Sequence, residues 1–502
     1  MKKFLTLALV GAMLLGVSSV VYANFCAFDN VPAATLLFPF VQFDYNNAAQ
    51  GQVTTFAITN VSSEAQIVHV TLWTDYSVAI LDFNILLTGY DVQSMNIRDI
   101  LRDGILPVTG PTFSNVGPLP NSDGPVSGTN SLNGWWIDDP GVGLAAPEST
   151  NDLVCTVGNP SGYAGGIPLS TLELFQTWLQ KSQTVTRVFD DTCLTGAPFS
   201  VVTGTWWLER DATTATWMYI TADVVTECNK LFPDSINYFN LLSLDNVLIG
   251  DLIYLDAINN YSEAMNAVHI EADMDAAAVV TPTAIGQYIG TPITFYHRYA
   301  AGNHVTVPAL DYREPLPTAW AFRYFNDINN IAFTWVRAWK GSTIWKNIPD
   351  LWADPWSENV SFMLANNCLA YTYYAWDEEE NVTSTTDNPW SQPGGERIVP
   401  NLLPLETQEV NVDEFNLPNE FGWMLFVWPA SNFIVPGGDT TPDYYQTWMG
   451  VKYQAFGQYS AGIPAAVMAN YNCFGDQVLP NLGVNYDYVG IDGYNVFMPP
   501  VN

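Results

Sequence analysis

The chain has 502 residues, with 50 Asp and Glu against 16 Lys and Arg, so its formal net charge at pH 7 is −34. So few bases exclude a nucleic-acid-binding protein, because no basic stripe is present to neutralise phosphates. The same deficit argues against binding to anionic membrane surfaces. Hydrophobic residues make up 48% of the chain, including 18 Trp, 25 Tyr and 26 Phe. We therefore expect large buried cores and not a disordered protein.

Residues 1–23 predict a secretory signal peptide. Two lysines precede an apolar run from Phe4 to Val21, and Ala23 ends a small-residue cleavage site. An uncleaved anchor is the alternative, but the run is short for a membrane span and no stop-transfer charges follow it. No later segment offers about 18 uninterrupted apolar residues, so we expect a secreted or cell-surface protein without a membrane span.

Six cysteines in an exported chain predict disulfide bonds. Their spacings are long and contain no C-x-x-C, which argues against zinc or haem attachment. The pairing favoured by position is Cys155 with Cys193, Cys368 with Cys473, and Cys26 with Cys228. Other pairings are possible, and free buried thiols are the alternative.

The first part of the chain reads as successive short strands. They are expected at Ala34–Tyr45, Val53–Asn60, Gln66–Asp75, Ala79–Thr88 and Tyr90–Ile97. Short strands at about ten-residue spacing with turn signals between them predict a β-sandwich.

A different region follows. Residues 104–166 are rich in Gly and Pro and contain no Lys or Arg, so we expect an irregular insertion over about 104–200. It includes the clearest helix, where Ser170 and Glu173 form a capping box. Strands resume at Thr216–Val225 and Asn246–Asp256.

The rest of the chain predicts a second sandwich. Its strands are expected at Ile331–Trp339, Asn367–Trp376, Leu403–Val412, Gly422–Trp428 and Tyr444–Phe456. LLTGYDVQSMNIRDI at 86–100 compares with LLPLETQEVNVDEF at 402–415. A diverged duplication or two unrelated segments of similar composition would explain this echo. We predict a mainly β protein with two immunoglobulin-like β-sandwich domains, 24–310 with the insertion and 318–502, and one short helix.

The stretch CAFDNVPAATLLFPFVQFDY and the segment SLDNVLIGDLIYLD resemble exported bacterial β-rich surface proteins. The resemblance is best over residues 26–101. It implies export and a surface location, and it brings no active site with it. The similarity to immunoglobulin-like sandwiches depends on the strand pattern alone, without the Cys…Trp…Cys signature.

Two acidic stretches are candidate metal sites. His269, Glu271 and Asp273 alternate, so in a strand they would share one face and offer nitrogen and oxygen ligands. Asp377 and Glu379 lie in an acidic run whose oxygens would suit calcium. The alternatives are a solvated strand face and a solvated hairpin tip, and no other cofactor is expected.

No catalytic motif is present. The chain lacks G-x-S-x-G, H-E-x-x-H and a phosphate-binding glycine loop, so we do not expect an enzyme. Tryptophans such as Trp335 and Trp339 would suit sugar stacking, with core packing as the alternative.

The run Ala34–Tyr45 contains Phe38, Phe40 and Phe43 and is a possible assembly strand. It could pair inside its own sandwich, the more frequent outcome, or add to the open edge of a neighbour. We expect a structural surface protein that binds copies of itself or other surface proteins as a layer, sheath or fibre. The alternative is a glycan-binding or accessory protein of a polysaccharide-active system.

Overall fold

The structure is a computed structural model. It describes residues 31–45, 51–75, 79–107, 216–226, 236–258, 260–272, 319–326, 332–341, 372–378, 406–415, 419–427, 446–455 and 459–467, with shorter pieces between them. The predicted signal peptide, most of the insertion and all six cysteines lie outside the described residues.

Within these residues the protein is mainly β, as the sequence predicts. The first half of the chain forms two antiparallel sheets, called sheet A and sheet B. Sheet A has the order β11 (Tyr261–Asn266), β10 (Leu248–Asp256), β2 (Val53–Asn60), β5 (Val92–Asn96). Sheet B has the order β12 (Val268–Ile270), β1 (Thr35–Phe43), β9 (Thr216–Val225), β3 (Gln66–Thr74), β4 (Ala79–Leu87), β6 (Trp135–Trp136).

The second half forms two further antiparallel sheets. Sheet C has the order β16 (Val382–Ser384), β15 (Thr372–Trp376), β18 (Phe421–Val427), β13 (Ala319–Phe325), β21 (Ala466–Val467). Sheet D has the order β17 (Thr407–Asn411), β14 (Ala332–Gly341), β19 (Gln446–Ala455), β20 (Tyr459–Pro464). A two-stranded sheet joins β7 (Arg187–Val188) and β8 (Thr205–Trp206), and α5 covers Ile236–Phe239.

The burial patterns follow from the sequence of each strand. In β2 and β10 buried residues alternate with more exposed ones, because one face of sheet A meets sheet B and the other faces solvent. In β1, β3 and β4 every residue is buried, because both faces of sheet B are covered. The near-continuous apolar runs of these three strands are typical of such a two-sided environment.

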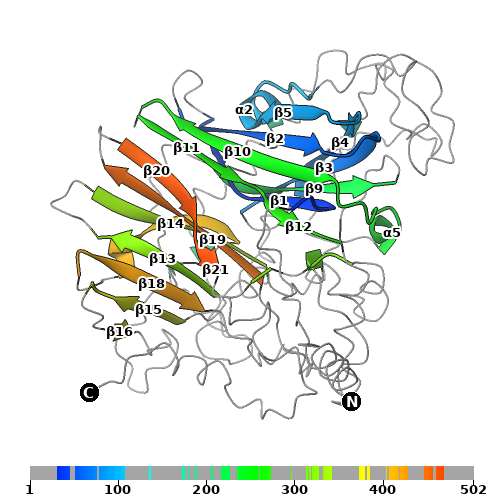
Figure 1. The fold of residues 1–502 in the computed structure, drawn as a ribbon. Coiled ribbons are helices and arrows are strands. Elements are labelled where there is room, and N and C mark those ends of the chain that lie inside the picture. The colour runs from blue at the N-terminus through cyan, green and yellow to red at the C-terminus, as the bar shows by residue number, and fades with distance from the viewer. Residues whose placement is uncertain are drawn as a thin grey trace, which may run out of the picture.

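The two halves have the same strand order (Figure 1). The order β12-β1-β9-β3-β4 of sheet B is repeated by β21-β13-β18-β15-β16 in sheet C, and the order of sheet A by β20-β19-β14-β17 in sheet D. A helical turn follows the fifth strand of each half, α2 (Ile97–Leu101) in the first and η4 (Val412–Phe415) in the second. The echo seen in the sequence falls on these two units, so the halves are topological copies.

The cross-strand registers align the copies residue by residue. Ala57 lies opposite Ser94 in sheet A, and Arg337 lies opposite Glu409 in sheet D. Through the same registers the following positions are counterparts: Ala57 and Arg337, Ser94 and Glu409, Ile253 and Lys452, Glu263 and Ala461, Ala264 and Gly462, Met265 and Ile463.

The second half packs against the first through sheet D. Figure 1 shows β20 beside β11, and β14 and β17 contact β1. The ring of Trp339 stacks on Phe295 with 5.8 Å between ring centres, and Thr407 Oγ1 donates to the carbonyl of Pro39 at 2.7 Å. One cluster of buried hydrophobic residues runs through both halves. Among the residues that the structure describes, none of the helices has the length and apolar character to cross a membrane.

Candidate functional site

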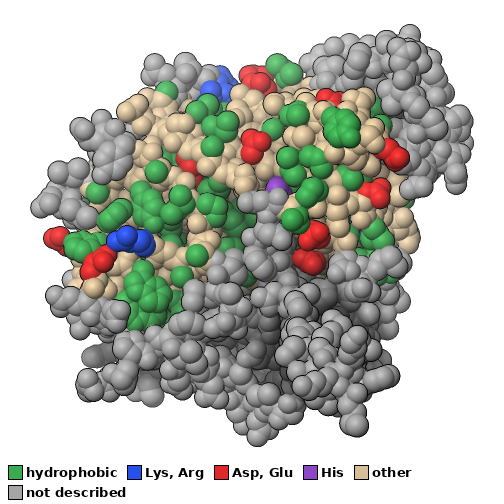
Figure 2. All heavy atoms as spheres, viewed as in Figure 1, with side chains coloured by type: hydrophobic (Ala, Val, Ile, Leu, Met, Phe, Trp, Pro, Cys, Tyr) green, Lys and Arg blue, Asp and Glu red, His purple; other side chains and the backbone are tan. Residues whose placement is uncertain are grey.

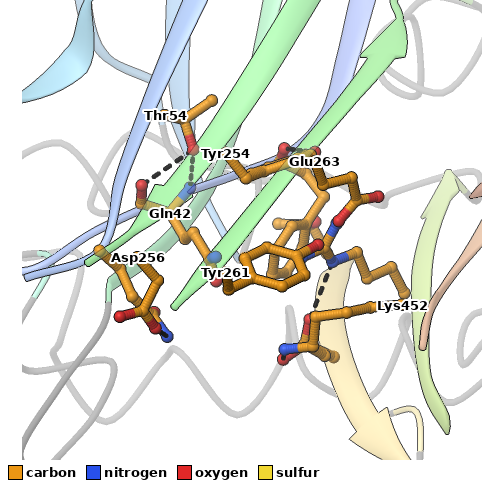
Figure 3. Close-up of polar contacts among 12 residues, drawn as sticks. Gln42, Thr54, Tyr254, Asp256, Tyr261, Glu263 and Lys452 are labelled. Carbon is orange, nitrogen blue, oxygen red and sulfur yellow. Dashed lines mark hydrogen bonds and ion pairs between the residues drawn. The ribbon is translucent and has the colours of Figure 1, made fainter. Parts of the chain in front are cut away.

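A cluster of four charged side chains lies buried where the two halves meet. Figure 3 labels two of them, Glu263 and Lys452. This junction cluster consists of Glu263 of β11, Arg337 of β14, Glu409 of β17 and Lys452 of β19. Arg337 Nη1 lies 2.5 Å from Glu263 Oε2, and Arg337 Nε lies 2.8 Å from Glu409 Oε2. Lys452 Nζ lies 2.6 Å from Glu409 Oε1. Two acids and two bases therefore neutralise one another across the junction.

Aromatic rings surround these charges. The guanidinium carbon of Arg337 lies 4.2 Å from the ring centre of Tyr254 and 4.9 Å from that of Phe40. Lys452 Nζ lies 4.9 Å from the ring centre of Trp335. Ring faces attract cations more strongly where water is excluded, so the rings stabilise both bases after burial. Tyr254 and Tyr261 come from the first half, as Figure 3 shows.

Burial and partner charges move the pKa values of this cluster in different directions. Burial alone would raise the pKa of Glu409, but Lys452 and Arg337 outweigh it and hold that pKa below its ordinary value. Burial raises the pKa of Glu263, against the lowering effect of Arg337. Burial also lowers the pKa of Lys452, opposed by Glu409. Because each charge is matched by an opposite one, the arrangement suits a permanent structural contact between the halves.

A second buried cluster is centred on Asp223 of β9. Its carboxylate accepts hydrogen bonds from the hydroxyls of Thr35, Tyr238 and Tyr296, the latter two at 2.5 Å. Arg313 Nε lies 3.7 Å from Asp223 and donates to Thr35 Oγ1 at 2.9 Å. Burial and the Asp223 charge raise the pKa of Tyr238, so this phenol stays a donor. The cluster fastens α5 and two later segments to sheet B.

His69 lies on the same sheet and is fully buried. Its Nδ1 is 3.0 Å from Asn84 Oδ1, and its Nε2 is 3.7 Å from an oxygen of Asp82. Asn84 lies directly opposite His69 on β4, which accounts for this contact. The histidine of β3 is thus held against β4 inside the fold.

The predicted metal ligands are only partly described. His269 is buried on β12, and its Nε2 accepts a hydrogen bond from the amide of Gly250 at 3.2 Å. Glu271 follows the end of that strand, and Asp377 follows β15. Asp273 and Glu379 lie outside the described residues. In the described part of the chain, no three His, Cys, Asp or Glu side chains gather as a metal site would require.

The predicted assembly strand is β1. It lies between β12 and β9 in the sheet of its own chain, and Phe38, Phe40 and Phe43 are fully buried. Trp339 is fully buried as well and Trp335 is partly buried, both on β14 at the junction.

The junction cluster was not singled out in the sequence. A signal was present, because Arg337 interrupts the apolar run IAFTWVRAW and Lys452 the run QTWMGVKYQA. A lone base inside an apolar strand of a base-poor chain indicates a buried pair, since unpaired charges are rarely buried. Its partners Glu263 and Glu409 come from two other strands, and only the fold brings them together.

The outer face of sheet A, turned away from sheet B, has an unusual composition. Its side chains are Thr55, Ala57, Thr59, Val92, Ser94, Asn96, Ile249, Asp251, Ile253, Leu255, Ser262, Ala264 and Asn266. Asp251 is the single charged residue among them. Ile253 and Leu255 are 38% and 41% exposed, and Figure 2 shows mainly hydrophobic and neutral side chains over these strands.

A smaller aromatic patch lies on sheet C. The rings of Trp376 and Trp423 are stacked with 3.8 Å between their centres, and Phe421 is 43% exposed. Beside them Arg323 Nη2 forms an exposed ion pair with Glu378 at 2.7 Å.

No protein-family model, no curated protein and no solved structure matches this chain.

Proposed function

We propose that this is a non-enzymatic, exported structural protein of the cell surface that associates with copies of itself. In this proposal the halves are immunoglobulin-like sandwich domains, at 24–310 and 318–502, and the six cysteines form disulfides. The first 23 residues act as the export signal. The strands of the two halves, which separate between Ile270 and Ala319, support this division.

The outer face of sheet A is the observation that carries self-association. Removal of Lys2 and Lys3 with the signal takes the formal net charge from −34 to −36 (−34 − 2), so mature copies repel one another wherever their acidic surfaces meet. Repulsion is smallest across a flat face with one carboxylate, and that face also exposes Ile253, Leu255 and Val92. Exposed apolar side chains that share one face of a sheet are typical of interaction surfaces.

The test is the size of the purified mature protein as a function of concentration, measured by analytical ultracentrifugation. We expect the wild type to form larger species, and the double variant Ile253→Glu with Leu255→Glu to stay monomeric. Phe421→Glu, an exposed residue on sheet C, is the control and should assemble like the wild type. A wild type that stays monomeric up to millimolar concentration would contradict the proposal.

Glycan binding is a second candidate function, and the aromatic patch on sheet C favours it. Exposed aromatic rings beside hydrogen-bonding charged groups suit the faces and hydroxyls of sugar rings. The patch offers the exposed ring of Phe421 and the partly buried ring of Trp423 next to the Arg323–Glu378 pair. Binding of soluble xylan and β-glucan, followed by tryptophan fluorescence, should be lost in Trp423→Ala. Unchanged fluorescence of the wild type with both polysaccharides would remove this candidate.

A further inference from the structure

We propose that copies join head to tail, the outer face of sheet A of one copy packing on the β20 side of the second half of the next. This rests on the self-association proposed above and specifies its two surfaces. The head includes Ala57 and Ile253, and the tail includes Ala461 and Ile463.

The internal junction supplies the template for this contact. There the outer face of sheet D packs on β11, so that Glu263 and Met265 are only 4% and 6% exposed. The counterpart of sheet D is sheet A, whose outer face exposes Asp251, Ile253 and Leu255 in the described part of the chain. The counterpart of β11 is β20, where Ala461 is exposed and Ile463 is 48% exposed. The junction thus uses β11 of the first half and the outer face of sheet D of the second half. The two corresponding surfaces, β20 and the outer face of sheet A, are not used in it.

Arg337 and Glu263 of the junction are replaced by alanine at the corresponding positions of the outer face of sheet A and of β20. In the junction, Arg337 binds Glu263, and Gly462 leaves room for that carboxylate, which a Cβ at Gly462 would overlap. The counterparts of Arg337, Glu263 and Gly462 are Ala57, Ala461 and Ala264. The base is missing on one open surface and the acid is missing on the other. At these three positions neither surface would therefore bury an unpaired charge on contact, which is the main penalty of a mismatched interface. Asp251 is the one carboxylate on the head surface.

The contact would be heterologous, because head and tail are different surfaces. Contacts of this type continue from copy to copy as an open filament unless the rotation closes a ring. Four strands at about 4.8 Å spacing and about 20 Å length cover roughly 400 Å². This is about half of what each partner buries in a standard interface, so we expect weak single contacts that need high concentration.

The experiment restores the junction pair between copies. At a concentration where the wild type assembles, Ala57→Arg and Ala461→Glu are each expected to stay monomeric, while the double variant in one chain assembles again. A mixture of the two single variants should form at least one-to-one dimers, because each retains one native surface. Sedimentation velocity measures all four samples, and circular dichroism checks that each variant is folded.

The outcomes separate this inference from the proposed function. A monomeric wild type overturns self-association itself. If the wild type assembles and Ala461→Glu assembles equally well, the tail is wrong and a symmetric face-to-face contact is indicated. The Ala461→Glu variant is by itself a sufficient test of the tail surface, because its exposed position leaves folding unaffected. Phe421→Glu controls for the added charge. A double variant that stays monomeric also contradicts the pairing of Ala57 with Ala461.

Discussion

At the scale of single residues, four of the bases that the structure describes are buried inside the fold. Of the Lys and Arg side chains that the structure describes, Arg313, Arg337, Lys340 and Lys452 are buried. Each has an acid or a carbonyl as partner, as burial of a charge requires. The four bases are therefore part of the packed interior, and a substitution at any of them changes the stability of the protein and not the charge of its surface.

Lys340 at the end of β14 gives the clearest dependence on pH. Its Nζ donates to the carbonyl of Leu403, and burial, only partly opposed by Glu406, lowers its pKa to about 7. Between pH 7 and the ordinary pKa of a lysine, the Lys340 side chain carries a proton in the unfolded chain that it lacks in the folded protein. The free energy of unfolding therefore rises with pH in this window, by at most about 1.4 kcal/mol per pH unit. Below pH 7 the destabilisation that burial of Lys340 causes is fully present.

We predict that Lys340→Met removes this rise, as measured by urea unfolding at intervals between pH 6.5 and 9.5. The variant also loses the bond to Leu403, so its absolute stability is not the readout. Arg323→Met, at an exposed base that keeps its charge throughout, should retain the wild-type slope. Parallel curves for the wild type and Lys340→Met would show that Lys340 holds its proton through this range.

At the scale of elements, the outer face of β20 packs against β11. The amide of Ser262 donates to Ser460 Oγ at 3.3 Å, and the Glu263 carboxylate passes next to Gly462. Exposed strand edges invite pairing with other chains, and here the Ser460 side chain of β20 accepts from an amide on the edge of β11. The glycine matters because the carboxylate needs its empty side to reach Arg337.

We predict that Gly462→Ala destabilises the protein by about 3 kcal/mol, since Glu263 must leave Arg337 to avoid the new methyl group. Chemical denaturation measures the change. In a Glu263→Ala background the same substitution should cost little, because the overlapping group is gone. Ala461→Ser, at the exposed neighbouring position, should stay within about 0.5 kcal/mol. Equal costs in both backgrounds would contradict the mechanism.

Strands with a strong pattern could be predicted from the sequence, and strands fixed by their neighbours could not. Val53–Asn60 is both the predicted strand and β2, because alternation and β-branched residues agree there. In contrast, β20 reads YSAGIP, and its Gly and Pro argue against a strand. It exists because it pairs with β19 as the last hairpin of the copied half. The same limit applies to the junction, whose members are far apart in the chain.

At the scale of the whole molecule, the two halves share a core. The hydrophobic cluster includes Phe38 and Tyr219 of the first half as well as Trp339 and Val451 of the second. Two sandwiches with separate cores would open independently, as linked domains commonly do. Here the opening of one half exposes apolar surface and buried charge on the other.

We predict a single calorimetric unfolding transition for the mature protein, with equal calorimetric and van't Hoff enthalpies. Arg337→Gln, which leaves Glu263 without its base, should lower the midpoint of this transition. Arg323→Gln, at the exposed ion pair, should leave it nearly unchanged. Two resolved transitions in the wild type would mean that the halves unfold separately despite the shared cluster.

The burial of the bases also changes how the molecule meets the salt around it. With Arg313, Arg337, Lys340 and Lys452 inside, the outside is left with carboxylates that few cations of the protein offset. Mobile counter-ions must supply the compensation, as a diffuse atmosphere about 10 Å thick at 0.1 M salt. Close approach of two copies compresses these atmospheres least at the outer face of sheet A, where Asp251 is the single charged residue. Ionic strength would thus act as an orienting influence: dilute salt permits only the one alignment, and concentrated salt makes other alignments accessible.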